Sequence, residues 1–153
     1  TITMPDPAFE RSAIPAVGKG DYREEICGFT VYAANIGVPH AVIFVDDIDS
    51  VEIEIFAPPI RHHPTFPEGA NVNFAEKVAF DKIRIRTFER GVECETASCG
   101  TGATASAAVA RRLGLVGDTV QVETRGGPLV IRFGETVTME GPAETVFSGV
   151  ITF

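Results

Sequence analysis

A cysteine directly before a glycine-rich segment is the feature of this sequence with the clearest chemical potential. Cys99 is followed by Gly100-Thr101-Gly102, which opens an alanine-rich run that predicts a helix over Thr101–Leu113. The first backbone N–H groups of a helix have no partners inside it, and the helix dipole adds partial positive charge there. Because glycines let a ligand approach this backbone closely, the segment predicts a site for a carboxylate or phosphate.

The same environment is expected to activate the thiol of Cys99. A positive potential favours thiolate over thiol, so we expect a lowered pKa for this side chain. The hydroxyl of Thr101 offers a further contact to a bound anion. An activated sulfur beside a carboxylate site suits removal of a proton from the carbon next to that carboxylate. The alternative is a buried cysteine that merely precedes a glycine-rich helix start.

Short strands and tight turns surround this helix in the predicted fold. The helix carries small residues on every side in its first turns, which indicates burial, and Gly114 is its expected C-cap. A second, short helix is predicted over Val51–Ala57, capped by Asp49 or Ser50 and ended by Pro58-Pro59. Strands are predicted at Thr1–Met4, Phe29–Asn35, Ala41–Val45, Asn71–Val78, Lys82–Phe88, Thr119–Thr124, Leu129–Phe133, Thr136–Glu140 and Thr145–Phe153. The predicted class is α+β, with an antiparallel, barrel-like sheet curled around the buried helix.

Composition narrows the class of protein. A length of 153 residues suits one domain, and a hydrophobic content of 44% excludes disorder. A formal charge of -8 without a basic run argues against nucleic acid or an anionic membrane as partner. No apolar run reaches the roughly 18–20 residues of a membrane span, and no signal-peptide pattern opens the chain. An odd number of cysteines, 3, favours free thiols in a reducing cytoplasm.

The residues around Cys99 resemble the C-terminal half of the diaminopimelate epimerase family. The most specific match consists of Glu89-Arg90-Gly91, Glu95-Thr96 and Cys99-Gly100-Thr101-Gly102-Ala103. Other matches occur in the expected order, at Asn35-Ile36-Gly37-Val38-Pro39-His40, His63-Pro64, Phe66-Pro67, Asn71-Val72-Asn73-Phe74, Gly141-Pro142-Ala143, Val146-Phe147 and Gly149. The resemblance therefore extends over nearly the whole chain.

This resemblance implies an enzyme of lysine biosynthesis that interconverts LL- and meso-diaminopimelate without pyridoxal phosphate or another cofactor. Two cysteines, one from each half of the protein, face opposite sides of the substrate α-carbon. One removes the α-proton while the other delivers a proton, and Cys99 resembles the second of the pair. The resemblance further implies that Asn71, Glu89, Arg90, Gly100 and Thr101 bind substrate, with His40 as an additional candidate contact.

Three features depart from the family pattern. Val38 stands where many members have Asn, which removes one side-chain contact to substrate. The stretch Gly91–Cys94 is one residue longer than in the shorter family pattern. The family's first cysteine motif, Cys-Gly-Asn-Gly, is not reproduced by Cys27-Gly28-Phe29-Thr30.

Residues 1-153 are therefore expected to form a single lobe, equivalent to the C-terminal half of a two-lobe epimerase, with the N-terminal lobe absent. Because a lobe with one thiol cannot run a two-base exchange, we expect this chain alone to be inactive. The expected partners are a small amino-acid substrate and the N-terminal lobe, and uncovered apolar surface makes a homodimer a further option. A stand-alone binding domain and a related proline or hydroxyproline racemase are the open alternatives.

The remaining cysteines and histidines have simpler interpretations. Cys27 is predicted to lie in a strand and fill the core. Cys94 is predicted to be an exposed or half-buried loop thiol, with a regulatory disulfide to Cys99 as the alternative. His40 and His62-His63 match no zinc-ligand spacing, so no metal site is expected.

Overall fold

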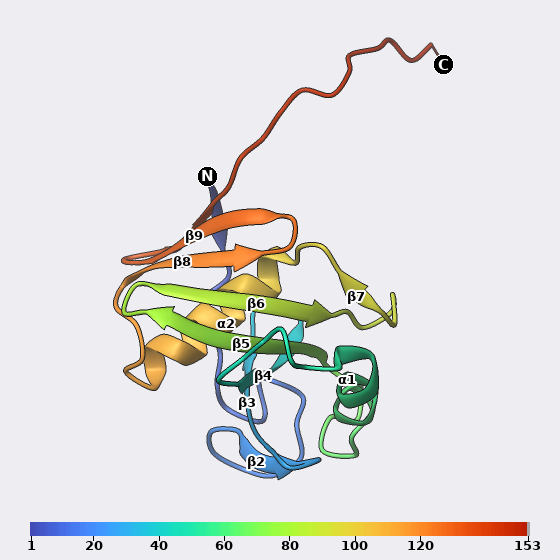
Figure 1. The fold of residues 1–153 in the computed structure, drawn as a ribbon, viewed down its shortest axis with the longest axis vertical. Coiled ribbons are helices and arrows are strands. Elements are labelled where there is room, and N and C mark those ends of the chain that lie inside the picture. Colours follow the sequence, from blue (N-terminus) through green and yellow to red (C-terminus); the bar gives the residue numbers. More distant parts are fainter. Residues whose placement is uncertain (153) are drawn as a thin grey trace.

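One large mixed sheet and two helices are formed by the part of the chain that the structure describes (Figure 1). The computed structural model describes residues 1–152. The sheet has ten strands in the order β1-β10-β9-β8-β6-β5-β4-β3-β2, with β7 paired to β6 off this path. The strands are β1 (Ile2–Met4), β2 (Arg23–Ile26), β3 (Phe29–Asn35), β4 (Pro39–Phe44), β5 (Asn71–Ala79), β6 (Lys82–Phe88), β7 (Glu95–Thr96), β8 (Thr119–Thr124), β9 (Gly127–Phe133) and β10 (Val137–Glu140). The helices are α1 (Ile53–Arg61) and α2 (Gly100–Arg112).

The strand directions correct the prediction of a wholly antiparallel sheet. β4 pairs with β5 in parallel, and β6 pairs with β8 in parallel, whereas the other pairs are antiparallel. Parallel neighbours need a crossover connection, and each of the two helices lies in one of these crossovers. The α+β class is confirmed, and the predicted antiparallel order is wrong at these two pairs.

The helix α2 packs against one side of the sheet. It contacts β3, β4, β5, β6, β8 and β9, and its residues from Gly102 to Ala110 are all buried. Small side chains allow this close approach because they keep the helix backbone near the strands. The predicted helix is confirmed, and its N-cap is Cys99.

The opposite side of the central strands is covered by α1 and the loops around it. Ile53, Ala57 and Ile60 of α1 are buried against this side. The helix continues through Pro58 and Pro59, so the predicted end at Ala57 is wrong. Burial of an apolar face offsets the backbone hydrogen bonds that proline removes.

The start of α1 also differs from the prediction. Its N-cap is Glu52, which makes no side-chain cap hydrogen bond, so capping by Asp49 or Ser50 is wrong. The Ser50 hydroxyl instead donates to the carbonyl oxygen of Asp47 at 2.8 Å. Neither helix is long and apolar enough to cross a membrane, as far as residues 1–152 are concerned.

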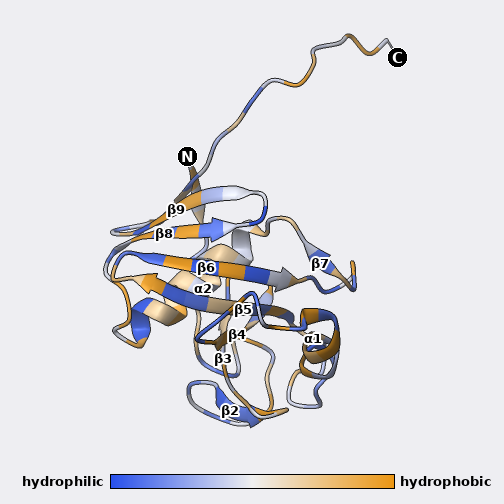
Figure 2. Ribbon diagram, viewed as in Figure 1, coloured by the Kyte–Doolittle hydropathy of each residue, from blue (hydrophilic) through white to orange (hydrophobic). Residues whose placement is uncertain are grey.

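The C-terminal segment Gly141–Thr152, called the tail below, leaves the body of the protein (Figure 1). It forms no strand, so the predicted strand at Thr145–Phe153 is wrong for the described residues, and Phe153 lies outside them. Figure 2 shows hydrophobic residues along the tail. Their exposed fractions run from 79% for Ile151 to 94% for Val150. The tail therefore presents apolar side chains that this chain does not bury.

Candidate active site

Cys99 lies at the start of α2, where its side chain caps the helix. Its backbone is extended, with φ -136° and ψ 108°, and its Sγ accepts a hydrogen bond from the N–H of Gly102 at 3.4 Å. The hydroxyl of Thr101 lies 3.5 Å from the same sulfur. The thiol thus replaces the serine or aspartate that usually caps a helix, and it is half-buried.

Two glycines allow the first turn of α2 to lie against the sheet. A Cβ at Gly100 would come within 2.8 Å of Cε of Met139, and a Cβ at Gly102 would come within 2.5 Å of Oδ1 of Asn73. The sequence suggested that these glycines admit a ligand to the backbone. The structure shows that they also admit neighbouring side chains, which places the first turn of α2 against β5, β6 and β10.

The protonation of Cys99 corrects the expected activation by the helix. Burial raises the pKa of the Cys99 thiol above its ordinary value. Hydrogen bonds from Thr101 and Gly102 lower this pKa, but the negative charge and hydrogen bonding of Glu89 raise it further. Desolvation therefore outweighs the hydrogen bonds from Thr101 and Gly102, which favours the protonated thiol of Cys99.

Glu89 follows the end of β6 and lies beside the thiol. Its Oε1 accepts a hydrogen bond from the hydroxyl of Thr96 at 2.8 Å. Thr96 lies in β7 directly opposite Thr87 of β6. The β7 position is held by Glu95, whose carboxylate pairs with Arg86 at 2.8 Å and with Arg125 at 3.0 Å. The two residues of β7 thus have different roles, since Glu95 fixes the position of the strand and Thr96 orients the carboxylate of Glu89.

Asn71 and Arg90 are brought together by the pairing of β5 with β6. Oδ1 of Asn71 accepts the backbone N–H of Arg90 at 2.8 Å, and its Nδ2 donates to the carbonyl oxygen of Pro39 at 3.2 Å. The Arg90 guanidinium donates to the carbonyl oxygens of Glu68 and Gly69 at 3.2 and 3.4 Å. Both predicted substrate residues therefore make internal contacts in this chain, and their role toward substrate stays a prediction.

His40 is completely buried on β4. Its Nδ1 lies 3.1 Å from Nδ2 of Asn73, while its Nε2 is buried without a hydrogen-bond partner among the described residues. Burial, together with the nearby positive charge of Arg90, lowers the pKa of His40 to about 3. The imidazole is therefore neutral at physiological pH.

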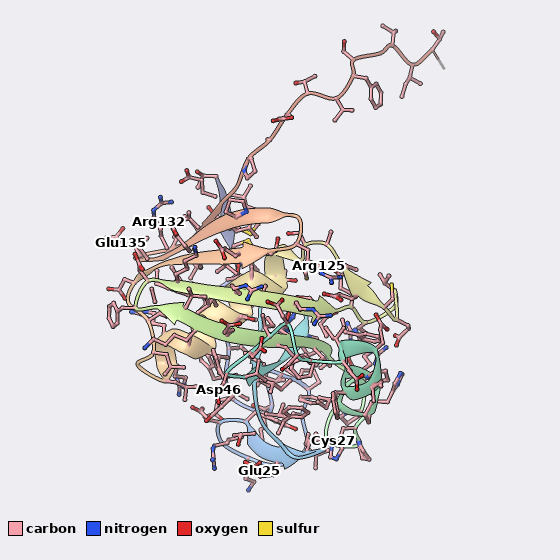
Figure 3. The ribbon with its side chains drawn as sticks, in the orientation of Figure 1. Glu25, Cys27, Asp46, Arg125, Arg132 and Glu135 are labelled. Atoms are coloured by element: carbon pink, nitrogen blue, oxygen red, sulfur yellow. The ribbon has the colours of Figure 1, made fainter. Side chains whose placement is uncertain are left out.

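The other two cysteines lie apart from this cluster. Cys27 is exposed in the turn between β2 and β3, at the end of the molecule opposite the tail (Figure 3). The prediction of a core strand residue is wrong, because Cys27 and Gly28 have φ of 52° and 81° and form the hairpin turn. Cys94 is exposed, as predicted, and the three cysteines are free, so the alternative Cys94–Cys99 disulfide is not formed.

Three residues of the site were given no role in the sequence analysis. Asn73 and Thr87 are buried beneath Gly102, and Thr96 orients Glu89. The spacing of Asn71 and Asn73, which places both on one face of a strand, was the available signal for Asn73. No group of three or more His, Cys, Asp or Glu side chains that could hold a metal ion occurs within residues 1–152.

The fold of the chain is similar to the folds of solved structures of an epimerase and of a phenazine biosynthesis protein. It matches a hydroxyproline epimerase from Agrobacterium vitis solved with bound trans-4-hydroxy-L-proline, with a TM-score of 0.51 and 18% identity over 89% of this chain and 46% of that one. It also matches a Bacillus anthracis phenazine biosynthesis protein of the PhzF family, with a TM-score of 0.51 and 24% identity over 66% of this chain and 34% of that one. At these identities the likeness concerns the fold alone.

Sequence comparison then gives the family. The family model described as diaminopimelate epimerase matches residues 32–146. Diaminopimelate epimerases from Methanothrix thermoacetophila and Methanocella arvoryzae are 58% and 50% identical over 99% and 98% of this chain. The enzyme from Neisseria meningitidis is 41% identical over 100% of it. The chain belongs to the diaminopimelate epimerase family, which confirms the resemblance, and it spans about half the length of these curated relatives, 54% of the first.

Proposed function

We propose that this chain supplies one of the two acid–base thiols of an enzyme that interconverts LL- and meso-diaminopimelate. The observation that carries this proposal is the half-buried thiol of Cys99 at the start of α2, beside Glu89, within the segment that matches the family. The first N–H groups of α2 have no partners within the helix and are suited to hold the substrate α-carboxylate. In this role Gly100 and Thr101 bind the carboxylate, Asn71 and Arg90 serve the rest of the substrate, and His40 is an additional candidate contact.

The protonated state of Cys99 assigns its role in the resting site. The thiol donates its proton to the α-carbon on one face, while a thiolate from elsewhere in the protein accepts the α-proton on the other face. The electron pair of the broken C–H bond forms the new one, and Cys99 is left as a thiolate. In the reverse direction Cys99 removes the proton. Positive charge and N–H groups at the α-carboxylate stabilise the carbanion-like state between the two transfers.

The second thiol is proposed to come from outside this chain. Cys27 lies in a hairpin turn at the end of the molecule that carries β2, and Cys94 is exposed in the loop after Glu89. Neither forms a hydrogen bond or a disulfide with Cys99 among the described residues. The chain alone is therefore expected to be inactive.

The tail supports a second lobe as partner. Its exposed apolar residues are mainly β-branched or aromatic, a composition typical of strands: Val146, Phe147, Val150 and Ile151. We propose that the tail adds a strand to the lobe that carries the second thiol.

Removal of the tail should change the free energy of unfolding of residues 1–140 by less than about 0.5 kcal/mol, since exposed residues without contacts contribute little. Mixing with the N-terminal half of the Methanothrix relative should give a complex only when the tail is present, as measured by size-exclusion chromatography. Self-association through the tail would instead indicate a homodimer.

The function is tested by combining the same two halves and following epimerisation of LL-diaminopimelate. We expect turnover from the combined halves and none from the isolated chain. Cys99→Ala should abolish turnover, whereas Cys27→Ser and Cys94→Ser are matched controls that retain it. Turnover by the isolated chain, or by the Cys99→Ala variant, would overturn the assignment.

We further propose that the protein works in a reducing cytoplasm, in keeping with its three free thiols, and that the curl of the sheet around α2 is barrel-like.

A further inference from the structure

We propose that Asn73 and Thr87 are positioning residues that hold His40 as a single neutral tautomer, with its proton on Nε2, ready to donate to an anion at the start of α2. The tautomer follows from the hydrogen bonds of this chain alone. The identity of the anion, a substrate carboxylate or the Cys99 thiolate, deepens the proposed function and rests on it.

The orientation of the Asn73 amide is determined by the backbone carbonyl of Ala41 and supported by the hydroxyl of Thr87. The backbone carbonyl of Ala41, 2.9 Å from Nδ2, can only accept a hydrogen bond, so the amide nitrogen must face it. The Thr87 hydroxyl then donates to Oδ1 at 2.9 Å. Both residues are buried, and Thr87 lies directly opposite Asn73 in the pairing of β5 with β6. The amide is thus fixed at both ends.

This orientation determines where the proton of His40 resides. The second hydrogen of Asn73 Nδ2 is directed to Nδ1 of His40, 3.1 Å away. An amide nitrogen donates and does not accept, so Nδ1 must be unprotonated and the neutral ring carries its proton on Nε2. A charged imidazole, or the other tautomer, would set two N–H groups against each other.

The surroundings oppose a charged ring as well. His40 is fully buried in β4, which disfavours charge, and Arg90 is the positively charged group close to it. The pKa of His40 is lowered to about 3, so a neutral donor persists over the physiological range.

The N–H at Nε2 is then a buried donor without an acceptor among the described residues. Such groups cost free energy and are rare, so an acceptor is expected in the working protein. Asn73 and Thr87 lie directly beneath Gly102, since a Cβ there would come within 2.5 Å of Asn73 Oδ1 and 3.2 Å of Thr87 Oγ1. The network thus touches the first turn of α2, where the helix N-terminus favours an anionic acceptor, and Arg90 adds positive charge near His40.

The tautomer is tested by 15N NMR of the ring nitrogens of His40 in this chain, assigned by comparison with His40→Asn. We expect a pyridine-like Nδ1 and a pyrrole-like Nε2 throughout the range in which a free histidine titrates. A proton on Nδ1, an averaged pair of shifts, or titration within that range would overturn the proposal. This readout needs no enzymatic activity.

Variants then separate positioning from simple burial. Asn73→Asp can only accept, so it should move the proton to Nδ1 or charge the ring. Thr87→Val removes the hydrogen bond to Asn73 Oδ1 and leaves the amide held only through Nδ2, so the looser amide should give partly averaged shifts. Thr87→Ser should restore the wild-type pattern. Ser106→Ala, which alters another fully buried polar side chain on α2, should leave the pattern unchanged. An unaltered tautomer in both Asn73→Asp and Thr87→Val would contradict the proposal. If Asn73→Asp does not fold, the comparison of Thr87→Val with Thr87→Ser decides alone.

Two further NMR measurements of the Nε2 proton of His40 identify the anion. A downfield shift of the Nε2 proton on raising the pH, absent in Cys99→Ser, indicates the thiolate, and a shift on adding diaminopimelate to the combined halves indicates the carboxylate. A proton that responds to neither would overturn the donor role. In the combined halves, Thr87→Val should lower kcat by roughly 10- to 100-fold with little change in KM, and Thr87→Ser should rescue it. Absence of activity in all combinations would overturn the proposed function and leave the tautomer result standing.

Discussion

The two faces of the central strands bury very different side chains. The face covered by α1 is filled with large apolar groups such as Phe74, Ile43 and Phe66. The face covered by α2 has no aromatic ring among its buried core residues within the described part of the chain. It combines valines, isoleucines and the alanines of α2 with buried polar groups, among them His40, Asn73 and Thr87. In Figure 2 this contrast appears as strong orange on α1 and pale colour along α2. The large apolar residues stabilise the lobe. The small residues of α2 let the start of this helix, where the proton transfer is proposed, lie against the buried polar side chains.

This division predicts that substitutions on the α1 face mainly change stability. Phe74→Ala removes a fully buried ring that packs edge-on against Phe29 at 5.5 Å between centroids. We expect a loss of about 3–5 kcal/mol in the free energy of unfolding, measured by urea denaturation. Phe80→Ala is the control, because that ring is largely exposed and should change stability by less than about 0.5 kcal/mol. A loss below about 1 kcal/mol at Phe74 would break the comparison.

The α2 face is predicted to lose stability in acid through His40. Its pKa is lowered from 6.5 to about 3, so the unfolded chain binds a proton more readily than the folded one. Stability from this group is complete above pH 6.5 and falls by about 1.4 kcal/mol per pH unit as the pH drops toward 3. Against His40→Leu, the wild type should therefore show a steeper loss in this window by urea denaturation.

Other groups also titrate in this window, so the difference between the two proteins is the quantity to measure. Ser106→Ala, a buried change without a titrating group, should keep the slope of the wild type. If the free energies of unfolding of the wild type and His40→Leu depend on pH in the same way, His40 accepts a proton in the folded protein without loss of stability.

A smaller effect is expected where α2 meets the sheet. Gly102→Ala would place a Cβ 2.5 Å from Oδ1 of Asn73, which forces the helix start or the amide to move. We expect destabilisation of about 1–3 kcal/mol, measured by urea denaturation, and altered ring 15N shifts of His40. Gly134→Ala is the matched control, since its Cβ would meet only the carbonyl oxygen of Thr136 at 3.9 Å. Equal stability of the two variants would argue against close packing at Gly102.

The smallest expected effect concerns the reactivity of Cys99. Because burial and Glu89 raise the pKa of this thiol, alkylation at neutral pH should be slower than at exposed Cys27, by roughly tenfold. Glu89→Gln removes the negative charge and should narrow this ratio. Rates are read by mass spectrometry of mapped peptides over a range of pH. Faster reaction at Cys99 than at Cys27 would restore the activation by the helix that the sequence suggested.

Local patterns in the sequence predicted much of the fold. The strands Phe29–Asn35, Lys82–Phe88 and Thr119–Thr124 have the predicted bounds, and α2 begins one residue before its prediction. These elements have strong propensity or clear turns, so local chemistry determines them. The errors occur where distant contacts decide: α1 passes through two prolines because its buried face holds it, and the tail lacks a partner strand.

The candidate site divides in the same way. The residue types around Cys99 pointed to a thiol and an anion site at a helix start, because glycines and an alanine run are visible in the sequence. The protonation of that thiol was predicted in the wrong direction, since desolvation depends on what packs over the sulfur. The network of Asn73, Thr87 and His40 joins three strands, and no local pattern shows which hydrogen bonds it makes.

The sequence by itself determined the family, the position of the reactive cysteine and the helix that carries it, because these depend on residue type and on contacts along the chain. Only the tertiary structure decided which strands run parallel, how charge is distributed around Cys99 and which tautomer His40 adopts. These properties arise from burial and from partners far away in the chain. Desolvation and hydrogen-bond direction are set by the folded surroundings of a side chain and not by its neighbours in sequence.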